Sequence, residues 1–189
     1  MVTKKSRHVF LMILALGAII AFAFYLSHLV RGNETVQDLV AQYGYVGIFL
    51  ISLISGFNLA IPVPAATFMP LFLEAGLLFW PAIFLMAIGV TTADFIAYFF
   101  GKIGQQVVVH SADGNTLSRL EDIRRRYYWG PIIFLFLFSS LAPFPNEIIL
   151  VPMGFLGYHF LRILPVVFVG NFIFNILYVS SFANLFEVL

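Results

Sequence analysis

Two proline pairs, each inside a long apolar stretch, constrain the fold of this chain more than any other feature. The first pair is Pro62 and Pro64, and the second is Pro143 and Pro145. Each proline removes a backbone donor and clashes with the preceding helical turn, so an α-helix that enters either pair must break. At membrane depth, broken backbone is tolerated only where protein or a wet cavity satisfies its polar groups. Both breaks are therefore predicted to lie inside the protein.

The membrane setting follows from composition. Apolar residues make up 61% of the 189 residues and charged residues only 10%, which indicates a single-domain integral membrane protein. The chain has no cysteine, so it offers no disulfide and no thiol nucleophile. It also lacks a phosphate-binding loop, a His-Glu-x-x-His motif and a nucleophile elbow, and its four histidines are scattered. We therefore predict no enzyme activity, no metal, no cofactor and no nucleic-acid partner.

The second proline pair follows the first by 81 residues, and other residues recur at the same spacing. The further pairs related by this shift are Gly76 and Gly157, Gly89 and Gly170, and Asp94 and Asn175. Two interrupted hydrophobic segments in corresponding halves are typical of membrane transporters. The chain is therefore predicted to contain two repeats, residues 36–104 and 117–186, behind an N-terminal helix in residues 1–30.

The lengths of the apolar runs predict which segments cross the membrane. Residues 9–30 follow three basic residues and are long enough to span, with a cleaved signal peptide as the alternative. Residues 31–43 have the spacing of a surface helix. The two apolar arms within residues 44–80 are each too short to span, so they predict a re-entrant hairpin, with two full spans as the alternative. Residues 81–100 then form a spanning helix.

The second half repeats this plan, since residues 131–138 enter, 148–160 return and 163–186 span. The predicted fold is an all-α membrane protein of two inverted repeats. Each repeat is a proline-broken re-entrant hairpin plus a transmembrane helix, and an N-terminal transmembrane helix precedes both. Each half crosses an odd number of times, so nine of the ten basic residues, all but Arg31, fall on the cytoplasmic side. A multi-pass protein of the cell inner (plasma) membrane with a cytoplasmic N-terminus is predicted.

Two acidic residues lie where an ionisable group is costly. Asp94 is near the middle of a predicted spanning helix, which by default marks an ion or substrate path. The alternative is a structural carboxyl bonded to Thr91, Thr92 or Tyr98. Glu147 directly follows the second proline pair at a helix start, where the free amides favour a negative charge. It could cap that helix or relay protons, and the same helix start could receive a phosphate oxygen.

Polar residues beside the breaks are candidates to line a cavity, although hydrogen bonds between helices would explain them equally well. These residues are Asn58, Ser139, Ser140 and Asn146, and hydrogen bonds between helices likewise explain Asn171 and Asn175, which lie in an apolar helix. A second candidate group is the basic run Arg124, Arg125 and Arg126, which could bind anionic lipid headgroups. The alternative for the run is a solvated basic face that fixes orientation in the membrane.

These residues resemble the DedA family of membrane proteins, which share the VTT (SNARE-associated) domain. The best local match is the series Gly89, Asp94, Tyr98, Gly101 and Gly104, which is similar to the family's glycine-acid-tyrosine-glycine helix end. The likeness covers residues 36–186, and both proline breaks look like the family's re-entrant loops. The resemblance implies translocation of undecaprenyl phosphate or a phospholipid, as a flippase or scramblase, with proton coupling proposed for some members.

The chain departs from the family's pattern at its charged loop residues. Phe57, Ala65 and Ala66 stand where the first loop usually has acidic and small residues. Ser140 and Asn146 stand where the second loop usually has arginine. Only Glu147 keeps an acid after a Pro-x-Pro. The departures affect the residues that the resemblance would assign to proton coupling and to anionic headgroup binding.

The sequence thus predicts lipid translocation along a path between the two hairpins, with membrane lipids and protons as partners. The predicted path residues are Asp94, Glu147, Asn146, Asn58, Ser140 and Tyr98. A non-transporting scaffold or assembly factor with the same fold is the main alternative, because such a protein needs no opening between the hairpins. A small-ion transporter that uses the two acids is the third hypothesis.

Overall fold

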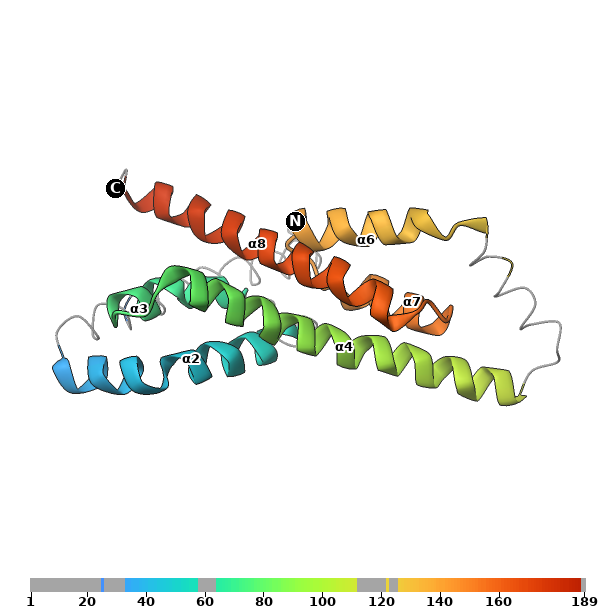
Figure 1. Ribbon diagram of the computed structural model, residues 1–189, viewed down its shortest axis with the longest axis horizontal. Helices are drawn as coiled ribbons and strands as arrows, with labels where there is room; N and C mark the ends of the chain where they lie inside the picture. The colour runs from blue at the N-terminus through green and yellow to red at the C-terminus, as the bar shows by residue number, and fades with distance from the viewer. Residues whose placement is uncertain (1–24, 26–32, 58–63, 112–121, 123–125, 188–189) are drawn as a thin grey trace, which may run out of the picture.

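The computed structural model describes residues 25, 33–57, 64–111, 122 and 126–187 (Figure 1). Its described secondary structure is entirely helical, which confirms the predicted all-α class. The elements are α2 (Glu34–Gly56), the short 3-10 helix η1 (Ala65–Phe68), α3 (Met69–Glu74), α4 (Phe79–Ser111), α6 (Trp129–Leu141), α7 (Glu147–Phe155) and α8 (Phe160–Glu187). The predicted helix in residues 1–30 lies outside the described residues.

Among the residues that the structure describes, two helices are long and apolar enough to cross a membrane. They are Phe79–Val107 in α4 and Phe160–Ser181 in α8, and they correspond to the predicted spanning helices 81–100 and 163–186. Large apolar side chains are exposed along both, such as Phe100 and Leu161. Exposed apolar surface of this extent suits contact with lipid. The helices next to the proline pairs are shorter: α6 has 13 residues and α7 has nine.

Helical structure is interrupted at both proline pairs, as predicted. On the first side, α2 ends at Gly56, and Pro64 has an extended backbone (φ −61°, ψ 135°) just before η1. Pro62 lies outside the described residues. On the second side, α6 ends at Leu141, and α7 begins only at Glu147, after the pair.

Two helices are longer than the sequence predicts. α2 runs without a break through Gly44, where a surface helix was expected to give way to an apolar arm. α4 continues past Gly101 to Ser111, although the polar segment was expected to begin there. A single glycine costs a helix only about 1 kcal/mol. Packing overrides that cost, since Gly101 is buried against α7.

The described helices run in two opposed sets. In Figure 1, α2 and α4 run from left to right, whereas α6 and α8 run from right to left. α2 packs on α4, and α6 packs on α8. The two sets meet where α4 contacts both α7 and α8. The helices α4 and α8 therefore cross the centre of the molecule in opposite directions.

The 81-residue spacing reappears in the backbone and in the packing. Gly76 and Gly157 have positive φ angles of 86° and 71°, and each ends the turn that follows a short helix. Such angles favour glycine because it has no Cβ atom. Five positions of one buried cluster match five positions of a second cluster by the same shift: Met69 with Leu150, Phe72 with Met153, Leu77 with Tyr158, Ala82 with Ile163, and Met86 with Val167.

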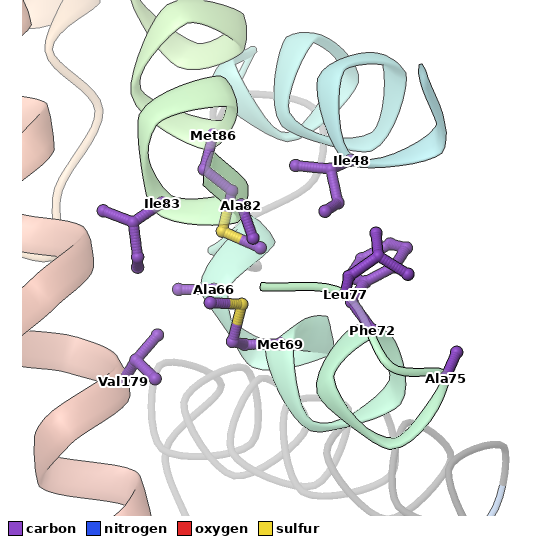
Figure 2. Packing of buried hydrophobic residues seen from close by; sticks show 10 residues of the cluster. All are labelled: Ile48, Ala66, Met69, Phe72, Ala75, Leu77, Ala82, Ile83, Met86 and Val179. Atoms are coloured by element: carbon purple, nitrogen blue, oxygen red, sulfur yellow. The ribbon is translucent and has the colours of Figure 1, made fainter. Parts of the chain in front are cut away.

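Each cluster also takes a side chain from the long helix of the other half. Figure 2 shows Val179 of α8 beside Met69 and Ala66 in the first cluster. Tyr98 of α4 belongs to the second cluster. Val179 and Tyr98 are themselves 81 residues apart, so the two halves exchange side chains at corresponding positions.

Small residues allow close contact where helices cross. A methyl group added at Gly101 would overlap the carbonyl oxygen of Val151 in α7, and one added at Gly154 would overlap the carbonyl oxygen of Tyr98 in α4. Gly89 meets Ser52 of α2 in the same way. Small residues at such crossings let backbones approach, as is common between membrane helices.

The crossing of α4 and α7 predicts different outcomes for two neighbouring glycines. Gly101→Ala should lower the free energy of unfolding by about 1–3 kcal/mol, because the added methyl group overlaps backbone. Gly104→Ala is the matched control: its nearest neighbour, a Phe155 ring carbon, would lie 3.6 Å away, which is ordinary contact. Thermal unfolding of purified protein in detergent should show a drop of several degrees for Gly101→Ala only. Equal losses for both variants would contradict this packing.

Candidate functional site

The carboxyl group of Asp94 is held by two asparagine side chains inside the molecule. Asp94 lies on α4 and is only 2% exposed. Its Oδ2 atom accepts hydrogen bonds from Asn171 Nδ2 on α8 (2.7 Å) and from Asn146 Nδ2 just before α7 (3.0 Å). Burial of a carboxyl group is costly without such donors. These two hydrogen bonds to Asp94, called the clamp below, therefore fix the second proline break against both long helices.

The two amide groups are also bonded to each other and to a threonine. Asn146 Nδ2 donates a second hydrogen bond to Asn171 Oδ1 (3.0 Å), and Asn171 Nδ2 donates to Thr91 Oγ1 (3.0 Å). Each amide nitrogen carries two hydrogens. Both hydrogens of Asn146 and both of Asn171 are thus used within this network, which joins three segments far apart in the sequence.

The network differs from the structural partners that the sequence suggested for Asp94. Thr91 contributes only through Asn171, and Thr92 Oγ1 donates to the carbonyl oxygen of Ile88 in its own helix. Tyr98 OH donates to the carbonyl oxygen of Tyr158 (2.6 Å) instead of reaching Asp94. Hydrogen bonds between helices were predicted for Asn171 and are confirmed, although its role as a donor to Asp94 was missed. Its signal was the spacing of two asparagines, Asn171 and Asn175, one turn apart in an apolar helix.

Glu147 is the first residue of α7 and is 4% exposed. Asn146 occupies the N-cap position, and its side chain makes no capping hydrogen bond. Glu147 is the acidic residue in the first turn of α7. A carboxyl group there interacts favourably with the helix dipole. Glu147 directly follows Asn146, whose side chain donates to Asp94. The structure thus brings the two predicted acids into one buried region.

A pocket of about 60 Å³ with both apolar and polar lining residues lies between the two proline breaks. It is lined by Ser55, Pro64, Ala65, Val90, Ser139, Ala142, Pro143, Phe144, Pro145, Asn146, Asn171, Phe174 and Asn175. Asn175 Nδ2 has no hydrogen-bond partner among the described residues, although the side chain is only 3% exposed. A buried donor without a partner costs about 1–3 kcal/mol, so this one is suited to receive an acceptor in the pocket.

The predicted site residues divide into those near the pocket and those elsewhere. Asn146, Ser139 and three of the four prolines line it, whereas the Ser140 hydroxyl turns back to the carbonyl oxygen of Phe136 (2.7 Å). Asp94 and Glu147 are not on its wall. Asp94 instead borders a separate space of about 10 Å³ between α4 and α8. Tyr98 borders that space too.

The remaining predicted residues lie away from the pocket or outside the described chain. Arg126 is exposed and lies over the ring of Tyr127. Asn58, Pro62, Arg124 and Arg125 are outside the described residues. Within the described part of the chain, no group of three histidine or acidic side chains could hold a metal ion.

Comparison of the chain with family models, with curated proteins and with solved structures finds no match. The DedA resemblance is therefore carried by the sequence motifs alone. The functional argument below starts from the buried network and the pocket.

The network predicts different costs for two asparagines one turn apart on α8. Asn171→Leu should lower the free energy of unfolding by about 1.5–3 kcal/mol, because it removes three hydrogen bonds, one of which is donated to the buried carboxyl group. Asn175→Leu should cost little or stabilise, since its amide nitrogen has no partner among the described residues. Thermal unfolding in detergent measures both. A larger loss of stability for Asn175→Leu than for Asn171→Leu would contradict the role of Asn171 in the clamp.

Proposed function

We propose that this chain is a multi-pass protein of the cell inner (plasma) membrane, built from two inverted repeats behind a cytoplasmic N-terminus. The helices α2 and α4 run in one direction, and α6 and α8 run in the opposite direction, which supports this arrangement (Figure 1). The positive φ angles at Gly76 and Gly157, 81 residues apart, support it independently. The short helices after each proline pair are then re-entrant segments that meet inside the membrane.

The function we propose is translocation of a membrane lipid by a flippase-like or scramblase-like mechanism. One observation carries it: the pocket has walls from both proline breaks and is lined by three asparagines and two serines. A polar headgroup cannot cross hydrocarbon unless other polar groups replace its water. Amide and hydroxyl side chains at the meeting point of the two breaks are suited to that exchange. The DedA resemblance points to the same function.

Proton coupling belongs to the proposal through Asp94. Two of the asparagines that line the pocket, Asn146 and Asn171, are the donors that hold this carboxyl group. A change in the protonation of Asp94 changes the strength of both hydrogen bonds, since bonds to an ionised acceptor are roughly twice as strong. The protonation of Asp94 thus affects the pocket wall through Asn146 and Asn171, although Asp94 itself does not line the pocket.

The main alternative remains a membrane scaffold, and a specific observation favours it. Asp94 Oδ2 accepts two hydrogen bonds from side chains of the protein, as the oxygen of a structural carboxyl group would. A scaffold would need the network and not the pocket. The two functions therefore differ in what happens when the pocket alone is altered.

A translocation assay in reconstituted vesicles separates these functions. Vesicles that contain the purified protein and a fluorescent phospholipid should show faster exchange between leaflets than protein-free vesicles. Asn175→Leu should reduce this rate at least tenfold while the protein stays folded, because the substitution makes the pocket wall apolar. Ser181→Leu, on an exposed part of the same helix, is the control and should leave the rate unchanged. Absence of exchange for every lipid tested would overturn the proposed function.

Asp94→Asn tests the coupling in the same vesicles. The amide oxygen of asparagine can accept the bonds that Oδ2 accepts, so the fold should survive within about 1 kcal/mol. Transport driven by a pH gradient should be lost if protonation of Asp94 is required. Retained gradient dependence would exclude Asp94 from coupling, whereas reduced stability with normal transport would assign it a structural role.

The proposed topology predicts where introduced cysteines can be labelled in this cysteine-free chain. Leu78→Cys, in the exposed turn before α4, should react with a bulky impermeant maleimide from outside the cell. Tyr127→Cys should react only from the cytoplasmic side. Ala142→Cys, on the pocket wall, should react from neither side. Fast labelling of Ala142→Cys from one side would contradict a re-entrant segment.

A further inference from the structure

The distribution of charge inside the molecule is one-sided. The buried charged residues among those described are Asp94 and Glu147, both acidic. Residues 32–101 contain no lysine, arginine or histidine at all. Residues 127–189 contain only His159 and Arg162, which are both exposed. These two ranges contain both breaks, residues 58–63 included, so neither break has a basic residue in its own segment of the sequence.

The described wall of the pocket has no charged side chain of either sign. Side-chain donors and acceptors there are amides and hydroxyls, without a positive charge. Ser139 and Ala142 bring the C-terminal end of α6 to the pocket, and the last carbonyls of a helix carry a partial negative charge. The opposite pole, at the start of α7, already has the acidic Glu147 in its first turn. The pocket therefore favours positive over negative charge in a ligand.

We propose that the pocket binds lipid headgroups that carry an ammonium group and no net negative charge, in preference to anionic headgroups. This inference rests on the proposed function, and it specifies the substrate class of the same site. The α6 carbonyls and the nearby acids attract the ammonium group. The Asn175 amide donates to an uncharged or diester oxygen of the headgroup. Burial of a phosphate monoester here would lack the cation that such a group requires.

The size of the pocket fits the ammonium end of such a headgroup. A cavity of about 150 Å³ holds benzene, which has six heavy atoms. The pocket of about 60 Å³ is smaller and accommodates a group of two or three heavy atoms. An aminoethyl end has three. The rest of a headgroup must lie outside the pocket as the structure has it.

A panel of lipids with identical fluorescent acyl chains tests the preference in reconstituted vesicles. Phosphatidylethanolamine should exchange between leaflets at least tenfold faster than phosphatidylglycerol and phosphatidic acid, and also faster than phosphatidylcholine, whose trimethylammonium end is too large for the pocket. Equal or faster exchange of the anionic lipids would overturn the inference and leave the proposed function intact. Failure of all four lipids would overturn the proposed function, and the binding measurement described below would then decide the inference alone.

Adding a cation to the pocket wall should reverse the preference. Asn175→Lys and Ala142→Lys each add an ammonium group at the pocket, and two positions are used because the more buried variant could fail to fold. In either folded variant, the ratio of zwitterionic to anionic exchange should fall at least tenfold. Ser181→Lys is the control with the same charge on exposed α8 surface, and it should keep the wild-type ratio. A ratio unchanged in the folded pocket variants would contradict the inference.

Binding can be measured without transport and can separate a lipid headgroup from a free amine. In detergent, short-chain phosphatidylethanolamine should raise the unfolding temperature more than short-chain phosphatidylglycerol does, and Asn175→Leu should remove the difference. Free ethanolamine at equal concentration should have no effect if the acyl-bearing headgroup is recognised. An equal shift with ethanolamine alone would show a small-amine site and overturn the assignment to lipid. A larger shift with phosphatidylglycerol would overturn the charge preference.

Discussion

A buried carboxyl group must have hydrogen-bond donors around it, and much of this structure depends on how Asp94 meets that requirement. Its donors come from the second proline break and from α8, so movement of either segment removes one of the two hydrogen bonds to the buried Oδ2 atom. The resulting network determines where α4, α7 and α8 meet. It also places Asn146 so that its side chain both donates to Asp94 and lines the pocket.

Packing of small residues makes that meeting point possible. Gly89, Ala93, Ala97 and Gly101 recur every fourth residue and form a stripe along α4. α2 packs against the first part of this stripe and α7 against the last, with Asp94 beside its middle. Larger side chains would separate these helices and take the donors out of range of the carboxyl group. Close packing and the polar network are thus parts of one arrangement.

Much of the fold was predictable because its causes are local. A Pro-x-Pro pair interrupts the helix in both halves, whereas the single prolines Pro152 and Pro165 lie inside α7 and α8. Apolar runs of sufficient length form long helices, so the two breaks and the courses of α4 and α8 followed from the sequence. The burial of Asp94 was predictable for the same reason. The continuation of α4 past Gly101 was not, because the contact with Val151 that favours it comes from residues fifty positions later.

The site was less predictable than the fold, because hydrogen-bond partners are chosen by tertiary geometry. The sequence offers several polar side chains within reach of Asp94, and nearby Thr92 and Tyr98 bond elsewhere while distant Asn171 becomes a donor. The proline pairs pointed to a cavity, but not to which polar groups would face it. Ser139 lines the pocket, and the adjacent Ser140 does not.

The exchange of side chains between the two halves has a consequence for biogenesis. The first buried cluster includes Val179, which the ribosome adds more than a hundred residues after Ile48 of the same cluster (Figure 2). The first half therefore leaves the translocon with its core incomplete and waits for α8 before it can close. A gene encoding only one half would yield a chain whose core lacks its last member, unless two copies with opposite orientations supplied it to each other.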